Sequence, residues 1–125
     1  MIASELFDDQ DSSSENTPLS ERRCIPCEGG VDPLTETEAQ ELAKQIDPEW
    51  TLVEGGGLLA RSFSFPNFKK TMEFVNKVAA IAEEEQHHPD MTVSYDNVGI
   101  ELMTHAIGGL SENDFILAAK IDEIK

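Results

Sequence analysis

The middle of the sequence carries one long amphipathic helix pattern between two hairpin patterns. Apolar residues recur at steps of four, three, four and three positions, which is the spacing of a single helix face (Phe68, Met72, Val75, Ala79 and Ala82). Upstream, residues 50–53 and 58–65 flank three consecutive glycines. Downstream, two alternating apolar segments, residues 91–95 and 98–102, flank Asp96-Asn97, which we expect to form the turn. This order commits the chain to a mixed fold of strands and helices.

Two further helix patterns complete the order. Thr35 with Glu38 three residues later predicts a capping box, and the helix that follows is expected to stop by Pro48. Ser111 with Asp114 predicts a second helix start, which opens a helix reaching Ile124. The predicted fold is therefore α+β, in the order α-β-β-α-β-β-α, with a four-stranded antiparallel sheet and three helices packed on one face. The free face or edge of such a sheet is a natural surface for self-association.

The N-terminal residues differ from the rest. Residues 1–23 are expected to form a disordered acidic arm because they are largely polar and rich in serine and carboxylates, and residues 24–125 to form the domain. The chain has 25 acidic and 9 basic residues, a formal net charge of −16, which argues against binding nucleic acid or an anionic membrane through a basic face.

Targeting and cysteine patterns favour the cytoplasm. The sequence has no apolar run near the roughly 20 residues of a membrane span, and its N-terminus lacks the features of a secretory signal. Cys24 and Cys27 have the spacing of half a zinc site, but no second pair completes it. Two reduced thiols are the favoured interpretation.

All three histidines fall within nineteen residues: His87, His88 and His105. Imidazole gives and takes a proton near neutral pH, so histidines from a helix end and a strand end that share one pocket would suit general acid–base catalysis. Simpler interpretations stay open. The histidines could be capping or surface residues, Asp114 could serve only as a cap, and Glu83 could belong to a solvated helix end. A metal site is less favoured because adjacent histidines on a helix diverge by about 100°.

The combined pattern resembles the pterin-4a-carbinolamine dehydratases. The resemblance extends from Cys24 to the C-terminus and rests on strings whose combination is more specific than any one of them. These are Cys24-Ile-Pro-Cys27-Glu-Gly-Gly, Leu34-Thr35, Arg61-x-Phe63-x-Phe65, Phe74-Val75-Asn76-Lys77-Val78, Glu83-x3-His87-His88-Pro89, Tyr95, His105 and Gly109-Leu110-Ser111-Glu112-x-Asp114.

The resemblance implies an activity and an assembly. The reaction would be loss of water from a 4a-hydroxytetrahydropterin to give the quinonoid dihydropterin, which recycles a tetrahydrobiopterin-type cofactor and needs neither a metal nor a redox cofactor. Homodimers or homotetramers would be expected. The same resemblance leaves open a non-catalytic dimerisation adaptor, or a role in another pterin pathway.

The resemblance also implies site roles. The catalytic set would be His87, His88 and His105. His87 and His105 would be the acid–base pair, and His88 would bind and orient the pterin. The substrate-binding set would add two supporting carboxylates, a residue lining the pocket and a residue packing on the ring (Glu83 and Asp114, Thr104, and Met91). Animal members carry an aromatic residue at the position of Met91, so stacking on the pterin would be weaker here, although a thioether still packs against a ring.

Overall fold

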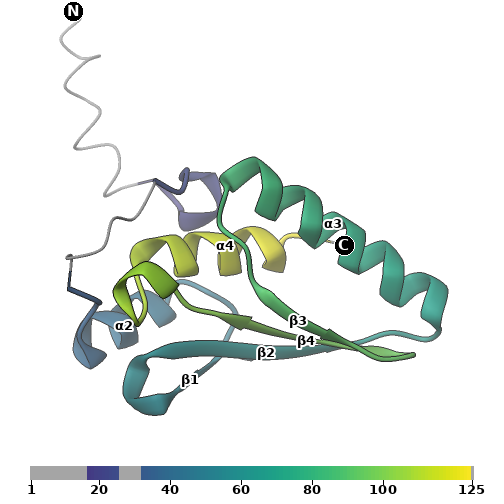
Figure 1. Ribbon diagram of the computed structural model, residues 1–125, viewed down its shortest axis with the longest axis horizontal. Helices are drawn as coiled ribbons and strands as arrows, with labels where there is room; N and C mark the ends of the chain where they lie inside the picture. The colour runs from purple at the N-terminus through teal and green to yellow at the C-terminus, as the bar shows by residue number, and fades with distance from the viewer. Residues whose placement is uncertain (1–16, 26–31, 125) are drawn as a thin grey trace, which may run out of the picture.

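The computed structural model describes residues 17–25 and 32–124 (Figure 1). It confirms the predicted α+β order of three helices and four antiparallel strands. The elements are η2 Leu19–Glu21, α2 Glu36–Ala43, β1 Thr51–Val53, η3 Glu54–Gly56, β2 Leu58–Ser64, α3 Phe68–Glu85, β3 Asp90–Val93, β4 Asn97–Leu102, η4 His105–Ile107 and α4 Glu112–Asp122. Within these ranges no helix is both long and apolar enough to cross a membrane.

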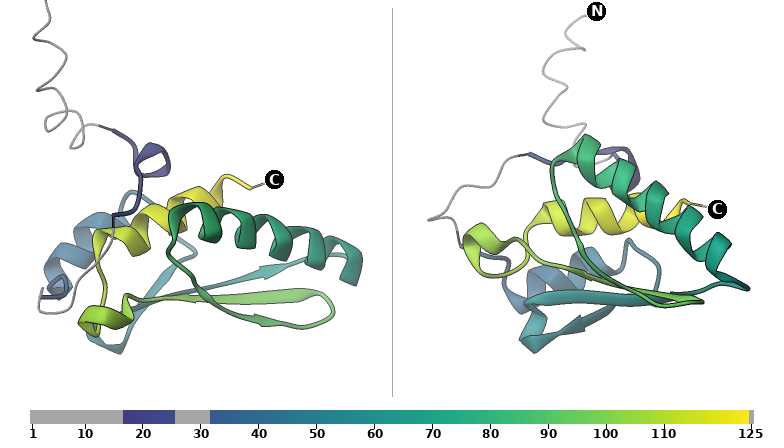
Figure 2. Two further views of the ribbon diagram at one scale, coloured as in Figure 1. Left: turned by 45° about the horizontal axis from the view of Figure 1, so that its top comes forward. Right: turned by 45° about the vertical axis from the view of Figure 1, so that its right-hand side comes forward.

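The sheet has the strand order β1-β2-β4-β3, so the two hairpins meet through their second strands. Every neighbouring pair is antiparallel, and Leu59 of β2 lies opposite Leu102 of β4. All three helices cover one face of the sheet, as predicted, and the other face is left open (Figure 2). Strand β3 forms one edge of the sheet and leads directly from the end of α3.

The core lies between the sheet and the helices. Helix α4 is buried along almost its whole length, and Phe115 and Leu117 are fully inaccessible to solvent. Phe74 of α3 packs on Phe63 and Phe65 of the second strand region, with ring centroids 4.7 and 5.0 Å apart. Offset aromatic pairs of this kind add to the free energy of burial, which ties α3 to the sheet.

Capping places the helix starts where the sequence predicts them. Thr35 and Glu38 form the expected capping box at α2, and Ser111 and Asp114 form one at α4. Helix α2 ends at Ala43, earlier than the expected stop by Pro48, because residues 44–47 turn and the Asp47 N–H donates to Asp122 Oδ2 at 3.0 Å.

The turn of the second hairpin lies one residue earlier than predicted. Val93 pairs with Val98 and the Ser94 N–H donates to Asn97 O at 2.9 Å, so Tyr95 and Asp96 form the turn instead of Asp96-Asn97. Carbonyl groups of this turn accept hydrogen bonds from elsewhere: Tyr95 O from the Thr71 hydroxyl and Asp96 O from the Phe65 N–H, each at 2.9 Å. These contacts, one from Thr71 in α3 and one from Phe65 just after β2, fix the turn.

The boundary of the N-terminal arm also differs from the prediction. Residues 17–23 belong to the predicted disordered arm, but they pack on the domain and contain η2, whose Leu19 is 2% exposed and belongs to the core. Besides Leu19, the Ser20 carbonyl accepts from Lys120 and Arg22 pairs with Glu112, so contacts with α4 hold this polar segment. Residues 1–16 and Cys27 lie outside the described residues.

Candidate active site

His87 is positioned by the way α3 ends. Gln86 adopts a left-handed conformation (φ 55°, ψ 40°), and the His87 N–H donates to Ala82 O at 3.2 Å, as in a Schellman motif. Gln86 is the one non-glycine residue in the described part of the chain with a positive φ. Backbone strain in a non-glycine residue is often found beside a functional group. Here it turns the chain so that the next side chain points toward the start of α4.

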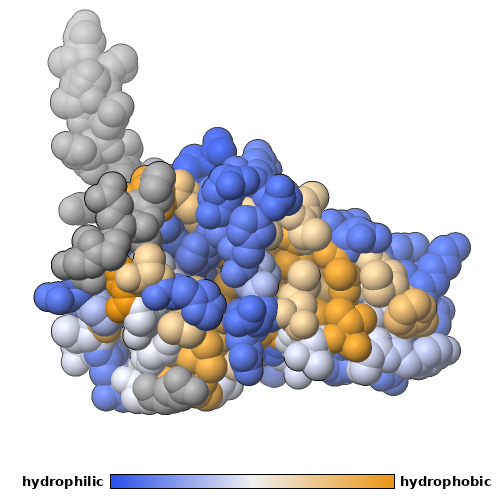
Figure 3. Space-filling view, in the orientation of Figure 1, coloured by the Kyte–Doolittle hydropathy of each residue, from blue (hydrophilic) through white to orange (hydrophobic). Residues whose placement is uncertain are grey.

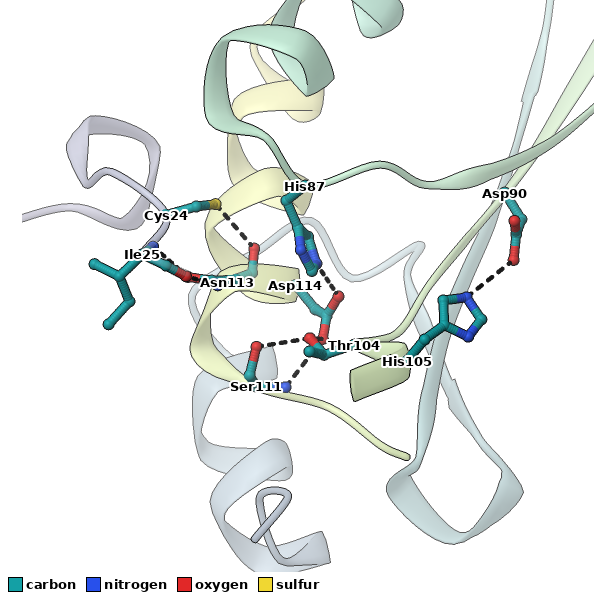
Figure 4. Close-up of polar contacts among 9 residues, drawn as sticks. All are labelled: Cys24, Ile25, His87, Asp90, Thr104, His105, Ser111, Asn113 and Asp114. Atoms are coloured by element: carbon teal, nitrogen blue, oxygen red, sulfur yellow. Dashed lines mark hydrogen bonds and ion pairs between the residues drawn. The ribbon is translucent and has the colours of Figure 1, made fainter. Parts of the chain in front are cut away.

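His87 meets a buried carboxylate there. Its Nε2 lies 2.6 Å from Asp114 Oδ1, and the Asp114 residue is 0% exposed. The other carboxylate oxygen, Oδ2, accepts from the Thr104 hydroxyl at 2.8 Å and from the Ser111 N–H at 2.9 Å. Three polar groups therefore converge on one carboxylate (Figure 4), and an ionised carboxylate only accepts hydrogen bonds. The His87 tautomer that fits this contact carries its proton on Nε2 and leaves Nδ1 as the unprotonated ring nitrogen.

Thr104 connects this cluster to His105. Thr104 is 3% exposed, so its hydroxyl does not face an open pocket. The hydroxyl donates to Asp114 and lies 2.8 Å from the Ser111 hydroxyl. Its N–H donates to Gly109 O at 2.8 Å and closes the loop that contains η4. His105 is the next residue after Thr104, so the same cluster that holds His87 anchors the loop bearing His105.

The other two histidines are open to solvent. The His105 side chain is 71% exposed, and its Nε2 lies 3.9 Å from Asp90 Oδ2 at the start of β3. The His88 side chain is 53% exposed, and its Nε2 lies 2.6 Å from Glu83 Oε2, one turn back on α3. Exposed imidazoles beside carboxylates can both bind and exchange protons with a ligand.

Five of the seven predicted site residues fall into two groups, and His105 and Met91 belong to neither. His87, Thr104 and Asp114 are joined by hydrogen bonds, whereas His88 pairs with Glu83 and, in the described part of the chain, no hydrogen bond joins that pair to the first group. Met91 lies on β3 opposite Ile100 and is half-buried. Among residues 17–25 and 32–124, no three His, Cys, Asp or Glu side chains are grouped so that they could hold a metal ion.

Two polar residues that the sequence did not single out lie beside the cluster. Glu85, two residues before His87, has a side chain 3% exposed, and Asn113, next to Asp114, is 4% exposed. A carboxylate in a run of three glutamates signals a solvated helix end, so no pattern in the sequence distinguishes Glu85 from Glu84. Only its contacts in the fold do so.

Buried charge near Glu85 affects two pKa values. Burial alone would raise the pKa of Glu85, but the Cys24 N–H bond and the charges of Lys120 and Arg23 lower it overall. The Cys24 thiol has a pKa raised to about 12, chiefly by burial and then by the negative charge of Glu85. Cys24 is therefore a protonated thiol near neutral pH.

Comparisons with known proteins point to one family. A family model described as pterin 4 alpha carbinolamine dehydratase matches residues 32–124. The chain is 55% identical over 104 residues to a protein of Nitrosomonas europaea, covering 83% of this chain and 90% of that one. It is 52% identical over 106 residues to one of Rickettsia canadensis, covering 85% and 96%. Both are named "Putative pterin-4-alpha-carbinolamine dehydratase".

A solved structure shares the fold. The chain matches a transcriptional coactivator/pterin dehydratase from Brucella melitensis with a TM-score of 0.67 and 34% identity, over 72% of this chain and 95% of that one.

Proposed function

The chain belongs to the pterin 4 alpha carbinolamine dehydratase family, and on that premise we propose that it removes water from a 4a-hydroxytetrahydropterin by histidine acid–base catalysis. The product would be the quinonoid dihydropterin, so the reaction would recycle a tetrahydrobiopterin-type cofactor. The observation that carries the proposal is the hydrogen-bonded series from His87 through Asp114 to Thr104, with His105 next in the chain.

The reaction requires two proton transfers. The bond between C4a and the hydroxyl oxygen breaks, and the oxygen leaves as water once a proton has been added to it. A ring N–H loses its proton, and the electron pair of that bond forms the new double bond in the ring. One proton is gained and one is lost, so an acid and a base suffice and no electrons enter or leave.

We assign these two roles to His87 and His105. The buried Asp114 carboxylate fixes the tautomer of His87 and would stabilise its imidazolium form, so that Nδ1 can take or give a proton. The exposed His105 can exchange its proton with solvent between turnovers. His88 with Glu83 would bind and orient the pterin, and Met91 would pack against it.

Substitution of the histidines tests the proposal. The wild-type protein should accelerate the dehydration of chemically prepared 4a-hydroxytetrahydropterin, followed by its ultraviolet change, and His87→Ala and His105→Ala should each lower kcat by about 10²–10⁴-fold. His88→Ala should mainly raise KM. Glu73→Ala, an exposed substitution on α3, is the control and should leave both constants unchanged. A wild-type protein no faster than buffer would refute the proposal.

We also propose that the protein self-associates as a homodimer or homotetramer. Val93 on the edge strand β3 is 40% exposed, and the stacked rings of Phe68 and Tyr95 are 48% and 64% exposed. Apolar side chains gather below α3 on this face (Figure 3). Exposed apolar residues beside an unpaired strand edge favour association. Light scattering should give two or four chains per particle, and Val93→Lys should reduce that number.

Protein binding is a second candidate function, because the Brucella melitensis relative is titled a transcriptional coactivator as well as a dehydratase. An adaptor would not need the histidines. A partner that is still bound after all three are changed to alanine would support it.

A further inference from the structure

The two helix ends that form the site are connected twice. The first connection is direct and joins His87 after α3 to Asp114 in the first turn of α4. The second runs through the N-terminal segment Arg23–Ile25, which we call the strap. It joins Glu85, two residues before His87, to Asn113, the residue before Asp114.

On the α3 side, Glu85 holds the strap through both carboxylate oxygens. Oε1 accepts from the Cys24 N–H at 2.8 Å, and Oε2 lies 3.1 Å from Arg23 Nε and 3.6 Å from Lys120 Nζ. The Lys120 ammonium also donates to Ser20 O at 2.9 Å. A carboxylate with a side chain 3% exposed is costly to bury unless its charge and lone pairs are satisfied, so these contacts depend on one another.

On the α4 side, the Asn113 side-chain amide forms two hydrogen bonds with the backbone of Ile25 in the strap, one as acceptor and one as donor. The Ile25 N–H donates to Asn113 Oδ1 at 3.0 Å, and Asn113 Nδ2 donates to Ile25 O at 2.5 Å (Figure 4). The Cys24 thiol lies 3.6 Å from Asn113 O. Asn113 is 4% exposed, so losing these bonds would leave buried polar groups unsatisfied.

We propose that Glu85 and Asn113 are positioning residues that act through the strap: by fixing the separation of the two helix ends, they hold His87 Nε2 against Asp114 and aim His87 Nδ1 at the substrate. This inference rests on the proposed function only for its effect on turnover, since the positioning itself is a property of the folded chain. Neither residue touches the reacting groups.

The expected effect on rate follows from the need for alignment. A displacement of about 1 Å in a catalytic group can cost about 10²-fold in rate. Asn113→Ala and Glu85→Ala should therefore lower kcat by about 10–100-fold while KM changes by less than about threefold. Glu85→Gln keeps an oxygen acceptor for the Cys24 N–H, so it should retain more activity than Glu85→Ala.

Nuclear magnetic resonance of the His87 ring tests the inference directly. The proton on His87 Nε2 should give a slowly exchanging downfield signal in the full-length wild-type protein, identified by its loss in His87→Gln. It should broaden or disappear in Asn113→Ala and Glu85→Ala and return at least in part in Glu85→Gln. Val98→Ala is the control, because Val98 is fully buried at the far end of β4 and its loss destabilises the core without touching the strap.

The outcomes are distinct. The inference would be overturned if the His87 signal were unchanged in folded Asn113→Ala and Glu85→Ala. It would also be overturned if Val98→Ala, compared at the same stability, lost the signal to the same extent. A wild-type protein that shows the signal but no dehydratase activity would refute the proposed function, and the comparison of signals would still decide the inference.

Discussion

Replacing Asp114 with asparagine should separate the catalytic role of this residue from its structural one. The two side chains have nearly the same shape, but the amide has one oxygen and one NH2 group. The Oδ2 position faces two donors, the Thr104 hydroxyl and the Ser111 N–H, whereas Oδ1 faces only His87 Nε2. The amide oxygen will therefore take the position with two donors, and the NH2 group will face His87.

That orientation reverses the tautomer of His87. An NH2 group facing Nε2 requires Nε2 to accept, so the ring proton moves to Nδ1 and the nitrogen assigned to catalysis is no longer basic. Loss of a positioned acid–base group corresponds to about 10²–10⁴ in rate, so we expect kcat to fall by about 10³-fold, or about 4 kcal/mol of transition-state stabilisation. Folding stability should fall by only about 1–3 kcal/mol, since two of the three hydrogen bonds are kept and the third is reversed in direction.

The assay combines steady-state dehydration kinetics over pH with urea unfolding. Asp96→Asn is the matched control, because it makes the same chemical change at an exposed position in the turn before β4. The control should match the wild type in both measurements. An Asp114→Asn protein with kcat within threefold of the wild type would refute the assignment of His87 Nδ1 as the catalytic nitrogen.

Three further predictions concern the surroundings of the site. In a Cys27→Ser protein, Cys24 should react with iodoacetamide at pH 8 about 10³-fold more slowly than a free thiol, because its pKa is raised to about 12; a rate near that of free cysteine, measured by mass spectrometry, would contradict the burial argument. The pKa of Glu85 is lowered in the fold, so its charge stabilises the protein above the usual pKa of glutamate, 4.5, and this contribution is lost as the pH falls below that value. Urea unfolding should therefore show a stability gap between wild type and Glu85→Gln that narrows from pH 7 to pH 3.5, and a gap that widened would have the wrong sign. Gln86→Gly should raise the free energy of unfolding by about 0.5–1 kcal/mol, because glycine adopts the left-handed conformation without strain; a destabilised variant would show that the Gln86 side chain, which donates to Glu83 O at 2.7 Å, outweighs the strain.

Local chemistry made most of the fold predictable. The Thr35 and Ser111 capping boxes each lie within four residues, so the sequence alone identifies both helix starts. The turn after β3 could not be placed as well, because its register is fixed by Thr71 and Phe65, which are far away in the chain. Where local patterns did not fix the position of a turn, hydrogen bonds between distant segments did.

The site, like the fold, was predictable from local patterns only in part. The cluster of three histidines indicated where chemistry could occur, but the pairing of His87 with Asp114 joins residues 27 apart, and Asp114 already had a sufficient explanation as a cap. The packing of residues 17–25 was unpredictable for a related reason. Apart from Pro18, Leu19 is the one apolar residue among residues 17–23, and one such residue gives no periodicity.

The Asp114 carboxylate closes the first turn of α4 through Oδ2 and orients His87 through Oδ1. Fraying of that turn would therefore release the histidine, so local unfolding and inactivation should be one event with one temperature dependence. This double use of Asp114 also limits which residues can replace it. Glutamate, the other common capping-box partner, would extend the carboxylate by one methylene in a fully buried position. The start of α4 therefore cannot be optimised as a helix without altering the active site.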